Sequence, residues 1–204
     1  MKMKRLVSLF LGVLMVFVMD TVSFAEFDLS VFEERKYLIT HDEFEDLAII
    51  DPVSMPVPAT KIPNGTFRIN PSIVILDTGE AFFRVLFSAY MEKWIFLNKI
   101  IIKIGEKKYY FEEEFSRGVR SGGYVKEELL FPLGNTGFSM IDEMRTASEV
   151  KIRMEGEKYF IDCVLSQKSI DVLLDFYDDF LKAGGSEKEY ILDAVDEKYP
   201  INVR

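Results

Sequence analysis

Alternation of apolar and polar residues runs through most of the chain after residue 37 and predicts short β-strands. In residues 81–91, for example, Phe83 and Val85 belong to one face, with polar positions between them. Gly105-Glu106 and Glu155-Gly156 separate pairs of such segments and predict hairpin turns. The predicted strands are residues 37–40, 47–50, 66–70, 72–76, 81–91, 99–104, 108–112, 124–131, 149–154 and 158–165.

A helical period replaces the alternation in residues 167–183. Apolar residues recur there at helical spacing, Ser166 is placed to cap the first turn, and Gly184-Gly185 is placed to end the helix. Shorter helices are predicted near residues 26–36, 138–147 and 187–197.

These elements predict a mainly β chain, α+β in detail. We expect an antiparallel β-sandwich with a short helix and a closing C-terminal helix, because the strands follow at hairpin spacing without regular helices between them. The sandwich is expected to span residues 26–185. Residues 51–65, with four prolines, form an extended crossing, and residues 186–204 form a tail with a short helix.

The first 25 residues have the layout of a secretory signal peptide. Lys2, Lys4 and Arg5 precede an apolar run over residues 6–19, and Ser23-Phe24-Ala25 predicts cleavage after Ala25. The alternative is an uncleaved anchor, but the run is shorter than the roughly 20 residues of a spanning helix. We therefore expect a secreted or envelope-associated protein with no membrane span after cleavage.

Charge and cysteine content restrict the classes of partner and the cysteine chemistry that are expected. The chain carries −9; residues 1–25 carry +2, which leaves −11 for the rest. This acidity argues against nucleic acid and against an anionic membrane surface. Cys163 is the only cysteine, so no disulfide can form within one chain, and its strand phase predicts a buried thiol. A catalytic pair of Cys163 with His41, the only histidine, is the alternative.

The loop at residues 113–123 is the stretch that most resembles a site. Its candidate ligand-binding residues are Arg117, Arg120, Gly122 and Gly123, because glycines allow close backbone approach and two arginines can bind a carboxylate or phosphate. The alternative is a mobile hairpin loop with solvated arginines.

An acidic turn at residues 41–46 offers candidate metal ligands. Asp42, Glu43, Glu45 and Asp46 supply the oxygens that calcium prefers, but not in the order of an EF-hand. The alternative is a solvated turn. No cofactor is predicted.

Aromatic and polar pairs give two further hypotheses. Trp94, with Phe96 and Tyr90 nearby, is either a sugar-stacking platform or an aromatic anchor of the core. Arg153 is expected to pair with Asp162 across a hairpin whose second strand turns Tyr159 inward.

Three pieces of the chain resemble an uncharacterised group of exported bacterial β-sandwich domains. They are DEFEDLAIIDP (residues 42–52), the single Trp94 before a strand that ends in a glycine turn, and residues 149–180. The resemblance implies a β-sandwich behind a signal or lipoprotein leader and implies no activity. The cysteine of a lipoprotein leader is missing here.

The sequence thus favours a secreted, non-enzymatic binding domain at the cell envelope. Loops at one end of the sandwich are expected to recognise a protein or a glycan. Two alternatives stay open: a hydrolase that acts on cell-wall or sugar substrates through scattered carboxylates, and a structural or assembly protein of the envelope.

Overall fold

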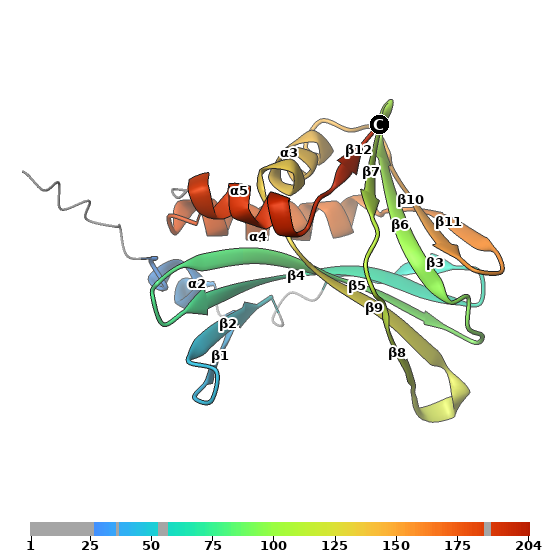
Figure 1. Cartoon of the computed structure of the whole chain (residues 1–204), viewed down its shortest axis with the longest axis horizontal. Helices are drawn as coiled ribbons and strands as arrows, with labels where there is room; N and C mark the ends of the chain where they lie inside the picture. The colour runs from blue at the N-terminus through green and yellow to red at the C-terminus, as the bar shows by residue number, and fades with distance from the viewer. Residues whose placement is uncertain (1–26, 36, 53–56, 186–188) are drawn as a thin grey trace, which may run out of the picture.

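The computed structural model describes residues 27–35, 37–52, 57–185 and 189–204. They form two antiparallel sheets and a small group of helices. In Figure 1 one sheet crosses the lower half of the molecule and the other rises steeply at the right, while α3, α4 and α5 lie above the first sheet. The predicted signal peptide lies outside the described residues.

The larger sheet has seven strands. In spatial order they are β1 (Leu38–Asp42), β2 (Leu47–Asp51), β4 (Gly65–Leu76), β5 (Ala81–Met91), β9 (Val125–Pro132) and β8 (Ser116–Val119), with β3 (Thr60–Ile62) pairing to β4. The long pairing of β4 with β5 continues through Pro71. On the other side of β4, the pairing with β3 ends at Phe67 and the pairing with β2 begins at Ile73. Among the described residues Pro71 therefore has no partner strand on that side, and its missing N–H disrupts no ladder.

The smaller sheet has five strands. In spatial order they are β11 (Phe160–Val164), β10 (Val150–Gly156), β6 (Leu97–Ile104), β7 (Lys107–Phe111) and β12 (Asn202–Val203). The predicted turn at Gly105 is confirmed, with Gly105 at φ 56°. The hairpin predicted from residues 149–154 and 158–165 is confirmed as β10 and β11, but its turn lies after Gly156 rather than at Glu155-Gly156, because β10 runs through Gly156.

Besides the 3-10 helix η1 (Ser121–Gly123), four α-helices complete the described chain. They are α2 (Ser30–Glu34), α3 (Asn135–Met144), α4 (Gln167–Lys182) and α5 (Glu189–Lys198). Ser166 caps α4 as predicted, its Oγ accepting from the Ser169 N–H at 3.1 Å, and Gly184 leaves the helix at φ 91°. Within the described residues no helix has both the length and the apolar character needed to cross a bilayer.

An aromatic core joins the helices to the larger sheet. Phe83 of β5 is 1% exposed and packs against Phe138 of α3 and against Phe176 and Phe180 of α4. Elsewhere the inner faces of the two sheets meet, as in the contact of Phe87 with Phe111. The prediction of a mainly β, antiparallel α+β fold is confirmed.

Candidate functional site

The loop singled out from the sequence lies at one end of the two sheets. It contains β8 and a short turn, Ser121–Gly123, in which Gly122 and Gly123 adopt φ values of 84° and 82°. The backbone N–H of Arg120 donates to the carbonyl of Tyr124 at 2.7 Å, and its side chain is exposed. The guanidinium of Arg117 is already bound to protein groups, the Glu127 carboxylate and the Leu97 carbonyl, so it is not free to join Arg120 in one anion site.

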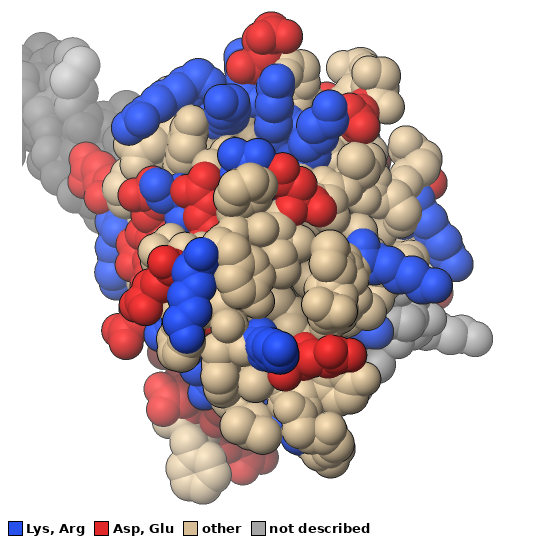
Figure 2. Space-filling model, turned by 90° about the vertical axis from the view of Figure 1, so that its right-hand side faces the viewer, with Lys and Arg blue, Asp and Glu red and all other residues tan. Residues whose placement is uncertain are grey.

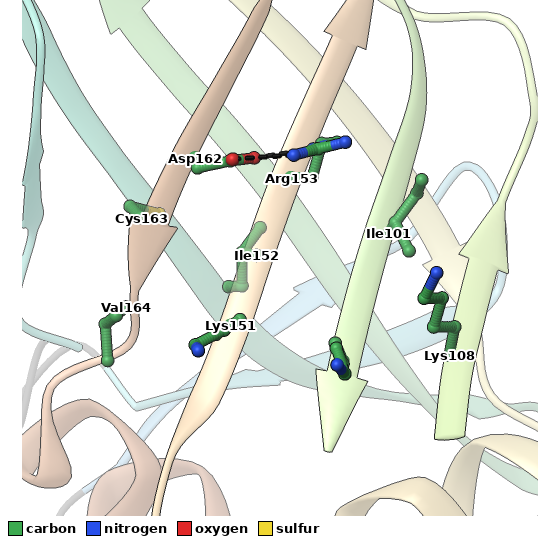
Figure 3. A pocket seen from close by; sticks show the side chains of 9 residues that line it. Ile101, Lys108, Lys151, Ile152, Arg153, Asp162, Cys163 and Val164 are labelled. Atoms are coloured by element: carbon green, nitrogen blue, oxygen red, sulfur yellow. Dashed lines mark hydrogen bonds and ion pairs between the residues drawn. The ribbon is translucent and has the colours of Figure 1, made fainter. Parts of the chain in front are cut away.

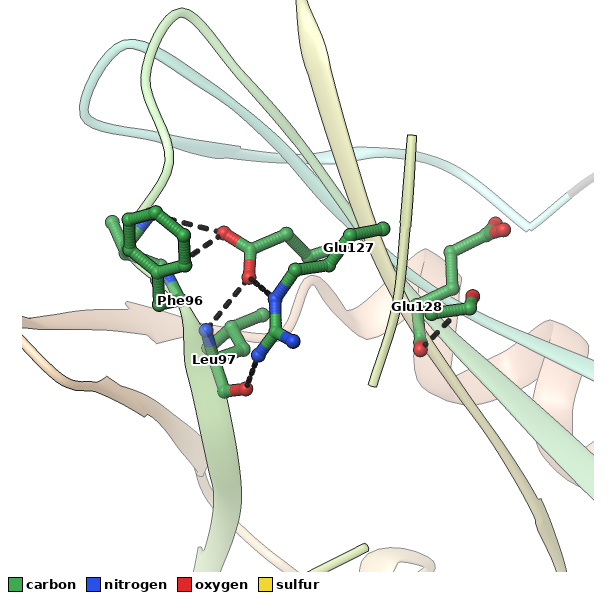
Figure 4. A network of polar contacts seen from close by, with 7 residues as sticks. Phe96, Leu97, Glu127 and Glu128 are labelled. Carbon is green, nitrogen blue, oxygen red and sulfur yellow. Dashed lines mark hydrogen bonds and ion pairs between the residues drawn. The ribbon is translucent and has the colours of Figure 1, made fainter. Parts of the chain in front are cut away.

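Arg117 belongs to a network centred on a fully buried carboxylate (Figure 4). Glu127 of β9 is 0% exposed. Its Oε1 accepts from the N–H groups of Ile95 at 2.9 Å and Phe96 at 3.1 Å, and its Oε2 accepts from the N–H of Leu97 at 2.7 Å. Arg117 Nε lies 3.3 Å from Oε2, and its Nη2 donates to the Leu97 carbonyl at 2.7 Å.

Four donors therefore offset the cost of burying the Glu127 charge. A buried carboxylate is unfavourable unless it is paired and hydrogen-bonded, and both conditions are met here. Because both oxygens are engaged and shielded from solvent, Glu127 is not placed to act as a general acid or base. Its structural effect is to fix the backbone that connects β5 to β6.

Phe96, at the centre of this connection, has an unusual backbone. Its φ is 57°, in the left-handed region that bulky residues rarely adopt. The residue that follows β10 also holds this segment, because the Glu157 N–H donates to the Phe96 carbonyl at 3.2 Å. A Cβ at Gly156 would lie 2.1 Å from the Ile95 carbonyl oxygen, so only glycine allows β10 to approach this closely.

The constrained segment carries two half-buried aromatic rings, and Trp94 also packs against the hydrophobic core, as its core-anchor alternative predicts. The rings of Trp94 and Phe96 stack with centroids 6.2 Å apart and an interplanar angle of 29°. Lys158 Nζ lies 5.0 Å from the centre of the Phe96 ring, and Tyr159 beside it is 45% exposed. We call Trp94, Phe96, Lys158 and Tyr159 the aromatic platform.

A shallow hollow of about 560 Å³ lies over the platform. All four platform residues line it, and the predicted loop contributes Val119 and Gly123 to its wall. Of the four loop residues predicted to bind a ligand, Gly123 is therefore the one that reaches this hollow. Tyr159 was predicted to face inward, which is wrong, because it lies in the turn before β11 rather than on the strand.

The acidic turn at residues 41–46 joins β1 to β2 at the far edge of the larger sheet. One oxygen of Asp42 accepts from the N–H groups of Phe44 at 3.0 Å and Glu45 at 3.3 Å, which is the pattern of an Asx turn. Glu43, Glu45 and Asp46 are exposed. Among the described residues no group of three or more His, Cys, Asp or Glu side chains is arranged to hold a metal ion.

Cys163 and His41 lie on different sheets, on β11 and β1. Burial raises the pKa of the Cys163 thiol to about 12, with a smaller contribution from Asp162. A thiol with such a pKa is protonated at neutral pH and is a weak nucleophile. The predicted pair of Arg153 with Asp162 is confirmed, with contacts of 2.7 and 2.8 Å.

Sequence reasoning missed Glu127, Lys158 and Tyr159. A signal for Glu127 was present, because it occupies the inward phase of β9 between Val125 and Leu129, where an apolar residue is expected. Comparison of the chain with protein-family models, with curated proteins and with solved structures finds no match.

Proposed function

We propose that this protein is an exported, non-enzymatic binding domain that recognises a glycan through the aromatic platform. Export is supported by the signal-like pattern of residues 1–25. One observation carries the binding role: Phe96 stays in a left-handed conformation because a fully buried carboxylate holds its backbone.

This arrangement is costly for the fold. Strained backbone conformations persist where the surrounding structure enforces them, and they cluster at binding sites. Here Glu127 and Arg117 bind the backbone of residues 95–97, the Arg117 guanidinium also lies 5.9 Å from the centre of the Phe96 ring, and Trp94 and Phe96 line the hollow. Preorganised rings reduce the entropy lost when a ligand binds.

The composition of the platform favours a sugar over an apolar ligand. Sugar rings have apolar C–H faces that stack on aromatic rings, and hydroxyl groups that need hydrogen-bond partners. Lys158, whose Nζ lies over the Phe96 ring, and the phenol of Tyr159 supply polar groups among the residues that line the hollow. The hollow is open and shallow, which suits a chain of sugars that passes across it.

Calorimetric titration with neutral oligosaccharides tests this function. The panel contains hexamers of glucose, of N-acetylglucosamine and of mannose, and neutral sugars keep the test independent of surface charge. We expect saturable binding of at least one hexamer by the native protein, and loss of that binding in Phe96→Ala and Lys158→Ala.

A matched control removes an aromatic ring elsewhere. Phe44 is 97% exposed at the tip of the β1–β2 hairpin, so Phe44→Ala changes the surface without touching the platform. The control should bind as the native protein does. Equal binding by Phe96→Ala, in a variant with native circular dichroism, would show that the platform is not the site.

A further inference from the structure

The outer face of the smaller sheet carries four cations in one cross-strand row. In the strand register, Lys151 of β10 lies opposite Lys103 of β6, and Lys103 lies opposite Lys108 of β7. Arg204, which follows β12, exchanges two backbone hydrogen bonds with Lys108, at 2.9 and 3.1 Å. We call Lys151, Lys103, Lys108 and Arg204 the cation row.

The row is only partly neutralised. Lys151 pairs with Glu149 at 2.9 Å, and the Arg204 guanidinium lies over the Tyr110 ring at 5.2 Å. Within the described residues, Lys103 and Lys108 make no ion pair, and each has a cation directly opposite. Like charges opposed across a sheet destabilise it, so this arrangement does not serve the fold.

Cationic side chains also gather visibly on this side of the molecule. Figure 2 shows Lys and Arg side chains along the upper part of the face, with Asp and Glu side chains among them, above a centre of uncharged residues. A hollow of about 510 Å³ adjoins the row, with Ile101 and Val164 among its lining residues (Figure 3). The face therefore combines a line of positive charge with apolar contact area.

We propose that the cation row binds a linear acidic polysaccharide. Neighbouring strands lie about 4.8 Å apart, so the four cations span about 14 Å in a line. An extended polymer with one carboxylate on each sugar matches a line of point charges. The apolar residues beside the row suit the C–H faces of sugar rings, which a polyphosphate lacks.

The surroundings of the row argue against broader polyanions. Glu149 and Asp162 border it, and Glu143, paired with Lys107, lies beyond its end. A duplex nucleic acid or an anionic bilayer would bring negative charge against these carboxylates, whereas a single narrow chain would not. The overall charge of −9 does not reveal this local group of cations.

Binding of polygalacturonate to the purified protein, measured across 20–200 mM salt, tests the proposal. Its fully methyl-esterified form, which has the same backbone without the charge, is the ligand control. We expect the native protein to bind only the acidic form, with affinity that falls as salt rises. Lys103→Gln with Lys108→Gln should weaken binding roughly tenfold at low salt.

A second double variant controls for net charge. Lys61 on β3 and Lys168 on α4 are exposed and make no ion pair among the described residues, so Lys61→Gln with Lys168→Gln removes the same charge elsewhere. This variant should bind almost as the native protein does. Circular dichroism and thermal unfolding confirm that both variants fold.

Several results would overturn the proposal. They are failure of the native protein to bind polygalacturonate, equal binding of the methyl ester, and equal weakening by the two double variants. Tighter binding of inorganic polyphosphate, duplex DNA or anionic phospholipid vesicles would assign the row to another class of ligand. The row lies at the opposite end of β10 from the platform, and neutral sugars do not test it, so this proposal and the proposed function fail independently.

Discussion

Replacing Glu127 by glutamine is expected to destabilise the protein more than its loss of one charge suggests. Glutamine puts an NH₂ group where one carboxylate oxygen accepted hydrogen bonds. If the NH₂ group takes the place of Oε2, it faces two other donors, the Leu97 N–H and Arg117 Nε. The buried Leu97 N–H then loses its partner, at a cost of about 1–3 kcal/mol.

The remaining hydrogen bonds weaken as well. Those from Ile95 and Phe96 to Oε1 change from charge-assisted to neutral, and neutral bonds are roughly half as strong. We expect a total loss of about 3 kcal/mol in the free energy of unfolding. For a domain of this size that corresponds to a fall in Tm of roughly 6–12 °C.

Urea unfolding, followed by both Trp94 fluorescence and far-ultraviolet circular dichroism, measures this loss. Glu157→Gln is the control, because that carboxylate is exposed near the same connection, and it should change stability by less than about 0.5 kcal/mol. Arg117→Gln should cost about 1 kcal/mol, since its side chain is 37% exposed and solvent screens the charge. A loss of less than about 1 kcal/mol in the free energy of unfolding for Glu127→Gln would refute the role that we assign to Glu127, which is to fix the backbone between β5 and β6.

Three further predictions concern the platform, the cation row and the lone thiol. Phe96→Gly should be about 1 kcal/mol more stable than Phe96→Ala in urea unfolding, because glycine adopts a φ of 57° without strain, and equal stabilities would argue against strain. Lys103→Gln should raise the free energy of unfolding by about 0.5 kcal/mol at low salt and by less in 0.5 M NaCl; a loss of stability would contradict like-charge repulsion in the row. Cys163 should react slowly with iodoacetamide in the native protein at pH 8 and quickly in urea, because its native pKa is about 12; fast native labelling would disprove this. Because folding raises the pKa of the Cys163 thiol, the protonated thiol contributes fully to stability below the unfolded pKa of about 8.5. This contribution is lost as the pH rises toward 12, and urea titrations across this pH range would detect the loss.

Strand alternation was sufficient to predict the fold class, because both sheets have one buried face. It failed where the backbone depends on neighbours distant in the sequence. The strands predicted at residues 66–70 and 72–76 are one strand, β4, which runs through Pro71 because β4 has a free side there, and only the sheet order reveals that free side. The β8 strand has four exposed residues and no alternation, and it exists through its pairing with β9.

The candidate site was predictable only in part. Loop composition drew attention to Arg117, but not to its carboxylate partner ten residues later, although the inward phase of Glu127 was visible. The left-handed backbone of Phe96 could not be predicted from the sequence, because a left-handed conformation is expected at glycine or asparagine and not at phenylalanine. The cation row joins β6, β7, β10 and the residue after β12 by strand register, so no local motif records it.

Trp94 fluorescence offers the most direct test of the central claim, that the aromatic platform binds a glycan. Trp94 is the only tryptophan in the chain, so its emission reports the platform without interference from other tryptophans. Titration with the neutral hexamers should give a saturable change in the native protein and in Phe44→Ala, and none in Phe96→Ala. The same saturable change in Phe96→Ala, or no change with any hexamer in the native protein, would contradict the account.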